Sequence, residues 1–233
     1  GTEMLEHASE SRHFRDYIEQ FDLWKGLTAA QRDELIAHTR YSCYAKREFI
    51  HRGALAHSGT LHVISGSLRI YLISEEGREF TLYILRDGDI GLMSSISHLN
   101  SVPCDIAIEA GKNTELFISD TMAVRSIFAE NIDVRACAYE YTIARLSEML
   151  WKLQQMIFLS ADRRLARFLL AESARTAGDE IRLTHEETAQ YLGTAREVVS
   201  RLIREFSQEG LVETARGRIQ ILNRAALKER AGA

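Results

Sequence analysis

Residues 184–201 have the sequence THEETAQYLGTAREVVSR, and this stretch decides the fold of the C-terminal third of the chain. It opens with a capping box, because the Thr184 hydroxyl can accept from the backbone N–H of Glu187, whose carboxylate can reach back to the N–H of Thr184. Gly193 follows the first short helix and can supply a sharp turn with positive φ. A second helix is expected over residues 195–208. The spacing predicts two short helices joined by a tight turn.

The residue types around this turn are those that a helix-turn-helix requires. Ala189 is small where the two helices would cross closely, and Val199 and Leu202 fall on the inner face of the second helix. The outward positions of that helix are polar: Arg196, Glu197, Ser200 and Arg201. An arginine can bridge O6 and N7 of guanine, and a glutamate can accept from N4 of cytosine. The pattern predicts a base-reading helix; the alternative is a helical hairpin with a solvated charged face.

The flanking sequence predicts a winged version of this motif. Ser160 can cap a helix over residues 163–175, and a short strand is expected at residues 181–183. After Gly210, the runs 212–214 and 218–222 form a predicted β-hairpin. Within this hairpin, the wing, two arginines suit contact with phosphate: Arg216 and Arg218. We also expect Thr184 and Thr194 to lie at the DNA surface.

The first half of the chain has a different residue pattern. Residues 12–40 predict short amphipathic helices, and from about residue 41 short β-prone runs alternate with glycines. The turn Glu75-Glu76-Gly77-Arg78 predicts a hairpin. The strand candidates are Glu48–His51, Leu61–Ser65, Ser67–Ile73, Phe80–Leu85, Asp105–Glu109 and Glu115–Ser119. Strands at this spacing predict a small antiparallel barrel or roll, so the fold class is α+β, with a jelly-roll-like antiparallel β-roll in front of the helical C-terminus.

A heptad pattern follows this β-rich region. Apolar residues recur at alternating four- and three-residue steps at Ile132, Ala136, Tyr139, Ile143, Leu146, Leu150, Leu153 and Ile157. Such a row is typical of a helix that pairs with another long helix. We expect a homodimer, with Tyr139, Ile143, Leu146, Leu150, Leu153 and Ile157 in its interface. The alternative is a single amphipathic helix that lies on its own barrel.

Charge and composition bound the class of protein. The net charge of −4 argues against a nucleic-acid partner for the chain as a whole. Residues 160–233, however, hold 13 Lys and Arg against 11 Asp and Glu, a net +2, whereas the rest carries −6. This asymmetry permits DNA binding at one end. No apolar run approaches the roughly 18 residues of a membrane span, and the three scattered cysteines form neither a disulfide framework nor a zinc pattern, so we expect a cytoplasmic protein without a membrane partner.

The motif Thr184-x4-Ala189-x2-Leu192-Gly193-Thr194-x-Arg196-Glu197-x2-Ser200-Arg201 resembles the Crp/Fnr family of bacterial transcription regulators. The likeness extends to the wing, to Ile64–Ile70 and Leu85–Asp89, which look like the family's β-roll strands, and to the heptad helix. The resemblance implies an effector domain over residues 12–125, a dimerisation helix over 126–159 and a winged helix-turn-helix over 160–233. It further implies that Arg196, Glu197 and Arg201 read half-sites of the TGTGA or TTGA type in double-stranded DNA, with RNA polymerase as a further partner.

The effector is less well defined than the DNA contacts. Cyclic-nucleotide-binding members carry a Gly-Glu pair and an Arg-Ser pair, where this chain has Gly91-Leu92 and Val102-Pro103-Cys104-Asp105. No cation stands there to face a phosphate, and Asp105 would repel one, so the sequence argues against cAMP. We expect an unidentified small-molecule or redox effector. Its pocket, placed by the resemblance, would include Leu92, Met93, Ser94, Ser95 and Cys104; the apolar residues in this stretch could equally be core.

The sequence argues against an iron–sulfur cofactor and leaves haem open. Residues 1–42 contain no cysteine, so the four ligands of an iron–sulfur centre are missing. A single histidine can ligate haem, which leaves a haem-based or thiol-based gas or redox sensor as the alternative; the candidate ligands are His51, His57, His62 and His98. Cys104 could be a redox thiol or a small buried hydrophobe, and Asp105 beside it would raise its pKa.

Two other classes of function compete with regulation. An enzyme with a cupin-like metal site would need His and Glu at close spacing on strands, and the sequence shows no such cluster. The second alternative is a module whose C-terminal helices bind protein rather than DNA. The helix-turn-helix spacing favours a DNA-binding regulator that is not an enzyme and that has no metal site.

Overall fold

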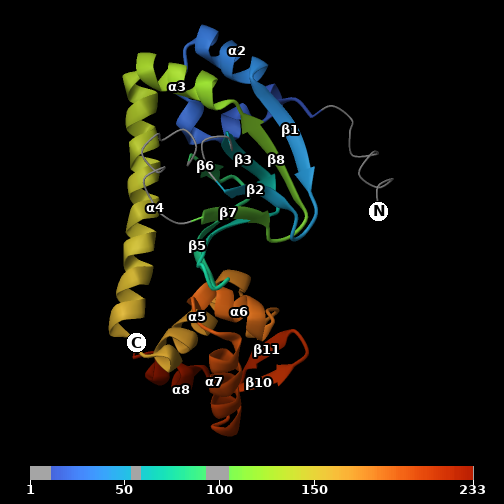
Figure 1. Cartoon of the computed structure of the whole chain (residues 1–233), viewed down its shortest axis with the longest axis vertical. Coiled ribbons are helices and arrows are strands. Elements are labelled where there is room, and N and C mark those ends of the chain that lie inside the picture. Colours follow the sequence, from blue (N-terminus) through green and yellow to red (C-terminus); the bar gives the residue numbers. More distant parts are fainter. Residues whose placement is uncertain (1–11, 54–58, 93–104, 233) are drawn as a thin grey trace. The chain divides into compact units, whose positions relative to one another are not determined.

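The computed structural model describes residues 12–53, 59–92 and 105–232 (Figure 1). Met93, Ser94, Ser95, Cys104, His57 and His98 lie outside these described residues. The chain divides into two compact units. The N-terminal unit comprises Gly1–Ser74 and Leu82–Ser147, and the C-terminal unit comprises Glu75–Thr81 and Glu148–Ala233.

Two four-stranded sheets form the body of the N-terminal unit. The first has the strand order β1 (Thr39–Tyr44), β8 (Thr114–Ser119), β3 (Thr60–Ser65) and β6 (Ile90–Gly91). The second has the order β2 (Phe49–Gly53), β7 (Asp105–Ala110), β4 (Ser67–Ile73) and β5 (Glu79–Arg86). The pairings of β8 with β1 and β3, and of β7 with β2 and β4, are antiparallel, which confirms the predicted roll.

The strand predictions differ from the structure mainly at two places. β4 has the predicted bounds, β3, β7 and β8 are one residue longer at one end, and β5 is one residue longer at both ends; β2 begins one residue later and ends two residues later than predicted. Strand β1, with the sequence TRYSCY, was not predicted, because its polar residues gave no clear alternation. The two-residue strand β6 was also missed, since Ile90 and Gly91 are too few to show any period.

Short helices close one end of this unit, and one of them contacts a buried histidine of the sheet. Three 3₁₀ turns, η1 (Phe14–Asp16), η2 (Ile18–Gln20) and η3 (Asp22–Trp24), precede α2 (Ala29–Ala37), where amphipathic helices were expected. The buried His62 side chain of β3 accepts a hydrogen bond at Nε2 from Nε1 of Trp24 (2.9 Å). Its Nδ1 lies 3.3 Å from the carbonyl of Phe117, to which it donates in this tautomer. Burial lowers the pKa of His62 to about 3, so the ring is neutral.

The predicted helix over residues 126–159 is two helices, α3 (Thr121–Glu130) and α4 (Ile132–Phe158). Residue 126, the expected first residue of the dimerisation helix, falls inside α3. Asn131 separates the two helices with φ −115° and ψ 100°, and its side chain accepts from the N–H of Val134 in the first turn of α4. The heptad row begins at Ile132, the first residue of α4, whereas α3 belongs to the helical stretch before it. Val124 and Ile127 of α3 lie in the core of the N-terminal unit.

From α5 to β11 the C-terminal unit has the order of elements that the sequence predicts, and the last helix, α8, was not predicted. The elements are α5 (Ala161–Thr176), β9 (Glu180–Ile181), α6 (His185–Leu192), α7 (Arg196–Gln208), β10 (Val212–Ala215), β11 (Arg218–Ile221) and α8 (Arg224–Ala231). The strands form a small sheet of order β10-β11-β9. Helix α5 begins two residues earlier than predicted, and Ser160 occupies its N-cap position without a side-chain capping bond.

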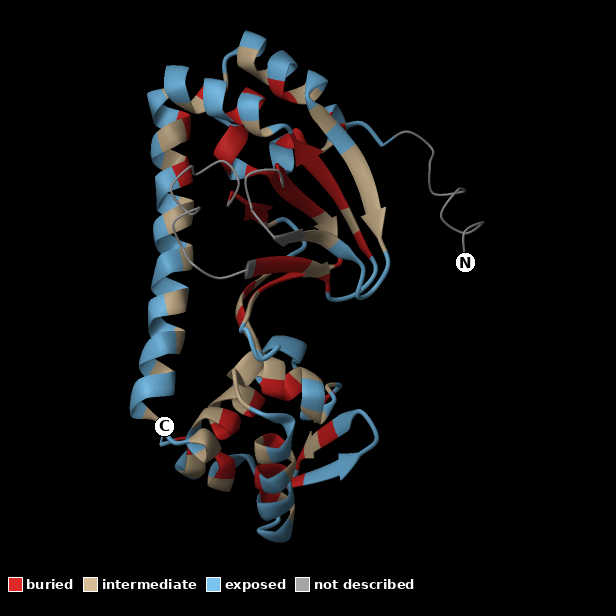
Figure 2. Cartoon of the chain, viewed as in Figure 1, coloured by how far each residue is buried: buried red, intermediate tan, exposed pale blue. Residues whose placement is uncertain are grey.

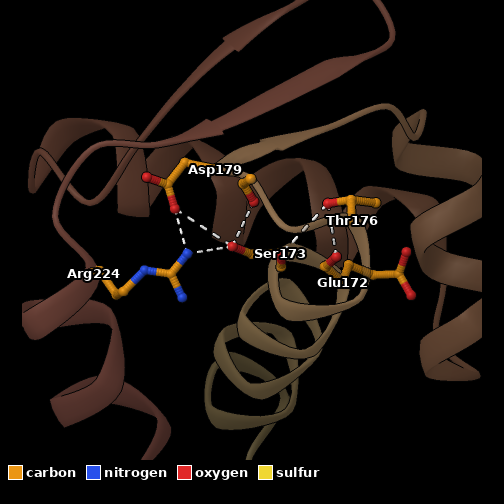
Figure 3. A network of polar contacts seen from close by, with 6 residues as sticks. Glu172, Ser173, Thr176, Asp179 and Arg224 are labelled. Carbon is orange, nitrogen blue, oxygen red and sulfur yellow. Dashed lines mark hydrogen bonds and ion pairs between the residues drawn. The ribbon is translucent and has the colours of Figure 1, made fainter.

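A polar network fixes the end of α5 to the small sheet and to α8 (Figure 3). The buried Ser173 hydroxyl donates to the carbonyl of Gly178 (2.6 Å). The Arg224 guanidinium donates to both Ser173 Oγ and the Asp179 carboxylate. The Asp179 carbonyl accepts from the N–H of Ile221 in β11. The wing is thereby held to the same helix that supports α6 and α7.

Candidate nucleic-acid interface

The turn between α6 and α7 has the geometry that its sequence predicts. Thr184 Oγ1 accepts from the N–H of Glu187 (3.1 Å), and Glu187 Oε2 accepts from the N–H of Thr184 (2.8 Å), so the capping box is present. Gly193 ends α6 with φ 64° and ψ 39°. The N–H of Thr194 then donates to the carbonyl of Ala189 (3.1 Å), which closes the turn. These bonds confirm the predicted helix-turn-helix.

The inner face of α7 anchors it in the core of the C-terminal unit. Val199 and Phe206 are fully buried, and Leu202 and Ile203 nearly so. They pack in one cluster with Leu165 of α5. Burial of each such side chain contributes about 1.5–3 kcal/mol. The helix is therefore rigidly supported from behind, and Figure 2 shows its opposite face exposed.

The outward face of α7 carries the predicted base-reading residues. Arg196 and Glu197 are exposed in the first turn, and neither forms an ion pair among the described residues. The Arg201 side chain is 67% exposed, with its Nε 3.9 Å from the Glu205 carboxylate, a loose contact that leaves the guanidinium able to turn. The structure thus brings Arg196, Glu197 and Arg201 to one open side of one helix.

Two features of this surface were missed in the sequence. Arg204 is also exposed on α7 and lies two turns beyond Glu197, and it forms no ion pair among the described residues. His185, the first residue of α6, places Nδ1 3.0 Å from the Ser200 hydroxyl and so ties α6 to α7. Burial, and secondarily the charge of Arg196, lowers the pKa of His185. Ser200 is therefore partly engaged within the protein rather than free to face DNA.

The N-terminus of α7 is open to an anion. Ala195 occupies the N-cap and offers no side-chain acceptor, so the first N–H groups of α7 lack a capping partner. A helix end of this kind attracts phosphate, because the free N–H groups and the helix dipole both favour negative charge. By contrast, the Thr184 hydroxyl donates to Glu187 Oε2 (3.0 Å) and serves its own helix.

The wing presents its two predicted arginines differently. Arg216 is exposed in the turn between β10 and β11 and has no ion pair among the described residues. Arg218 Nη1 lies 3.3 Å from the Glu180 carboxylate, which also accepts from Arg182 Nε (2.7 Å). These two arginines lower the pKa of Glu180. A phosphate would have to compete with Glu180 for Arg218, which the sequence did not reveal.

The heptad row on α4 is exposed along its length (Figure 2). Tyr139 is 57% exposed and Ile143 61%, and the remaining predicted interface residues are at least half exposed: Leu146, Leu150, Leu153 and Ile157. Val134 and Ala138, on another side of α4, contact the core of the N-terminal unit instead. Within the N-terminal unit, Tyr139, Ile143 and Leu146 therefore do not lie on the barrel, which contradicts the alternative for this part of the row.

The predicted effector residues are only partly within the described chain. Leu92 is 6% exposed and packs in the core cluster of the N-terminal unit. Both ring nitrogens of His62 are engaged in hydrogen bonds, so this haem candidate has no lone pair to offer to iron. His51 is half-buried on β2.

A buried polar triad in the second sheet was not foreseen. Arg69 of β4 is 5% exposed, and its Nη1 donates to Glu109 Oε1 of β7 (2.9 Å). Tyr71 donates its hydroxyl to Glu109 Oε2 (3.2 Å), and Arg69 Cζ lies 3.9 Å from the centre of the Tyr71 ring. The sequence analysis assigned no role to any of these three residues.

Two features of the described residues bear on other classes of function. Within the described residues, no helix is both long and apolar enough to span a membrane. In the same residues, no three His, Cys, Asp or Glu side chains gather as a metal site would require.

Comparison with known proteins fits this architecture. Residues 163–230 match the Crp-like helix-turn-helix domain. A solved structure assigned to the Crp/Fnr family, from Eubacterium rectale, is 36% identical and superposes with a TM-score of 0.84 over 92% of this chain and all of that one. The transcriptional regulator LdrP of Thermus thermophilus is 30% identical over 186 residues, covering 70% of this chain and 92% of LdrP. The Cyclic AMP receptor protein of the same species is 27% identical over 212 residues, which cover 89% of this chain and 95% of that protein.

These relatives are transcription regulators and not enzymes. Their likeness covers both units, and the domain match covers the helix-turn-helix and wing described above. The chain belongs to the Crp/Fnr family of transcription regulators.

Proposed function

We propose that this regulator binds a palindromic operator as a homodimer and that α7 reads its bases. The observation that carries the proposal is the row of exposed, unpaired or loosely paired charges on α7 — Arg196, Glu197 and Arg201 — on a helix whose other face is locked in the core. An arginine free to turn can bridge guanine O6 and N7, and a glutamate can accept from cytosine N4.

The exposed seam on α4 supports the homodimer. Six large apolar side chains at heptad spacing stand exposed in the single chain: Tyr139, Ile143, Leu146, Leu150, Leu153 and Ile157. Contiguous apolar faces of this kind mark protein interfaces, and heptad spacing fits a second copy of the same helix. Two copies would present two α7 helices to successive major grooves about 34 Å apart.

We further propose that the effector is a small molecule other than cAMP. One relative is named a cyclic AMP receptor protein, at 27% identity. In this chain, however, Leu92 follows Gly91 where the family's cyclic-nucleotide-binding pattern implies a glutamate, and residues 102–105 offer no cation for a cyclic phosphate. We also propose RNA polymerase as a further partner, which the family resemblance implies.

The experiment is recovery of bound fragments from the sheared genomic DNA of the host organism, with sequencing of what is retained. Wild-type protein should enrich a limited set of sites, and the Arg196→Ala/Arg201→Ala double variant should lose that enrichment while it still retains DNA at low salt. Arg175→Ala is the matched control, because Arg175 lies on α5 and pairs with Glu172. Retention of fragments in simple proportion to their abundance by the wild type would refute the proposal.

A further inference from the structure

The C-terminal unit contains a cavity of about 150 Å³ beside the helix-turn-helix. Its walls come from the last turns of α4, from α5, from α6 and from one residue of β5. Its apolar lining is Phe80, Trp151, Met156, Phe168, Tyr191 and Leu192. An apolar cavity of roughly this volume holds one benzene ring. The rings of Phe168 and Tyr191 are stacked, with centroids 5.4 Å apart, and so form a flat wall for such a ring.

Two arginines in the same wall lack a negative partner. Arg164 and Arg167 line the cavity from α5, and neither forms an ion pair within the described residues. Arg164 Nη1 donates to the carbonyl of Leu192 (2.8 Å), and its buried Nε has no hydrogen-bond partner among the described residues. Arg167 donates to the carbonyl of Ala231 and to Gln155 Oε1, both at 2.9 Å. Every acceptor is neutral.

No Asp or Glu is among the residues that line this cavity. Burial lowers the pKa of Arg164, as expected for a guanidinium that is desolvated without a carboxylate beside it. Arginine nevertheless stays protonated, so the positive charge persists next to the apolar wall. A bound carboxylate would complete the pairing that the protein itself leaves open, since guanidinium and carboxylate form strong charge-assisted hydrogen bonds.

We propose that this cavity binds an amphipathic monoanion, namely a carboxylic acid with an apolar body of about the size of one ring. The apolar body lies against Phe168 and Tyr191, and the carboxylate pairs with Arg164 and Arg167. The site is separate from the predicted effector residues at 92–104 and does not depend on whether α7 reads DNA.

Such a ligand would contact the helix-turn-helix itself. Tyr191 and Leu192 are the last residues of α6, and Gly193 follows them at the turn. The Phe80 ring sits so close to Gly193 that a Cβ there would lie 2.3 Å from Phe80 Cδ2. A bound ligand therefore touches both the end of α6 and the ring that packs on the turn, and it should stabilise the C-terminal unit by mass action.

The experiment compares three probes on the full chain without DNA. Benzoate carries both ring and charge, benzyl alcohol carries the ring alone, and inorganic phosphate carries the charge alone. Calorimetry should show saturable binding of benzoate, binding of benzyl alcohol at least tenfold weaker, and no saturable binding of phosphate. Because Trp151 lines the cavity, benzoate should also change tryptophan fluorescence, and Trp151→Phe should abolish that change.

Variants then locate the site. Ala171→Phe fills the cavity from its rim without removing a polar group and should abolish benzoate binding. Arg167→Gln should weaken it at least tenfold, whereas the matched control Arg163→Gln, on the same helix but outside the cavity, should leave it unchanged. Equal binding of benzoate and benzyl alcohol, saturable phosphate binding, no benzoate binding, or full binding by a folded Ala171→Phe variant would each overturn the proposal.

Discussion

At the scale of single residues, the arginines of α7 and those of the wing should contribute differently to DNA binding. Arg196→Ala or Arg201→Ala should cost about 1–3 kcal/mol per half-site and relax the preference at one base position, because a bridged guanine would lose its partner. Selection on random DNA followed by affinity titration measures both effects. Unchanged sequence preference in both variants would remove these arginines from base reading.

Arg218→Ala should behave differently from the α7 variants. It should weaken binding to specific and non-specific DNA alike, because a phosphate contact carries no base information. The slope of log K against log salt concentration should fall by about one in magnitude. Glu180→Gln is the complementary change, since it frees Arg218 and Arg182 from their shared carboxylate. We expect it to tighten non-specific binding, as measured by anisotropy on shuffled duplexes. A loss of sequence preference in Arg218→Ala would show instead that the wing reads bases.

His62 should make the stability of the N-terminal unit depend on pH. Its pKa falls from 6.5, the ordinary value, to about 3 on folding, so the unfolded chain binds the extra proton below about pH 6.5. Stability is therefore full above that pH and is lost as the pH drops toward 3. At pH 5 the loss should be about 2 kcal/mol relative to pH 8.

Urea unfolding followed by Trp24 fluorescence in a Trp151→Phe background measures this loss. His62→Gln is the matched control, because its amide oxygen can still accept from Trp24 Nε1 without titrating. The variant should remove most of the pH dependence between pH 5 and 8. If the free energy of unfolding falls with pH equally in the wild type and in His62→Gln, groups other than His62 cause the loss of stability in acid.

At the scale of elements, local signals in the sequence located the C-terminal unit well. The capping box at Thr184, the glycine at 193 and the inner positions Val199 and Leu202 each constrain the backbone directly, and each is present in the structure. The pairing of Arg218 with Glu180 and of His185 with Ser200 could not be predicted in this way, because it joins residues from different elements.

The N-terminal unit shows where such signals fail. Only one polar residue, Asn131, separates α3 from α4, and a single helix was predicted across the end of α3 and the whole of α4. The triad of Arg69, Tyr71 and Glu109 depends on the register of β4 against β7, and a single strand contains no information on its register. Residues 93–104, which hold most of the predicted effector pocket, lie outside the described chain.

The exposed seam of α4 predicts a dimer that charge can break. Leu146→Glu with Leu150→Glu should place carboxylates in an apolar interface, at a cost of several kcal/mol, and yield a monomer. Ala144→Glu, also exposed on α4 but off the heptad row, is the matched control and should remain dimeric. Light scattering at micromolar concentration measures the mass of each protein. A monomeric wild type would contradict the proposal.

At the scale of the whole molecule, the proposed regulator should not respond to cyclic nucleotides. Calorimetry with cAMP or cGMP at millimolar concentration should show no saturable heat, because residues 102–105 offer no cation to a cyclic phosphate. The same titration with benzoate, which we propose binds in the cavity of the C-terminal unit, should show saturable heat. A micromolar constant for cAMP would mean that another cation, such as the buried Arg69, faces the phosphate.

Homodimer formation and base reading by α7 depend on each other, because a dimer can read a palindromic site only if both α7 helices reach one face of the duplex. The acidic remainder of the chain, with a net charge of −6, disfavours other modes of DNA contact, and residues 160–233 carry the only net positive charge of the two segments. Binding should therefore be confined to the C-terminal unit and should weaken steeply with salt.

Selection of the full-length wild type on random duplex DNA, with sequencing of the bound pool, examines base reading and dimer symmetry together. We expect a two-fold symmetric motif whose half-sites are about 10 base pairs apart, centre to centre, and each contain a TGA core. The guanine in each half-site should be the base whose preference is lost in Arg196→Ala or Arg201→Ala. A bound pool without any enriched motif, or with a single half-site and no symmetric mate, would contradict sequence-specific binding by a homodimer.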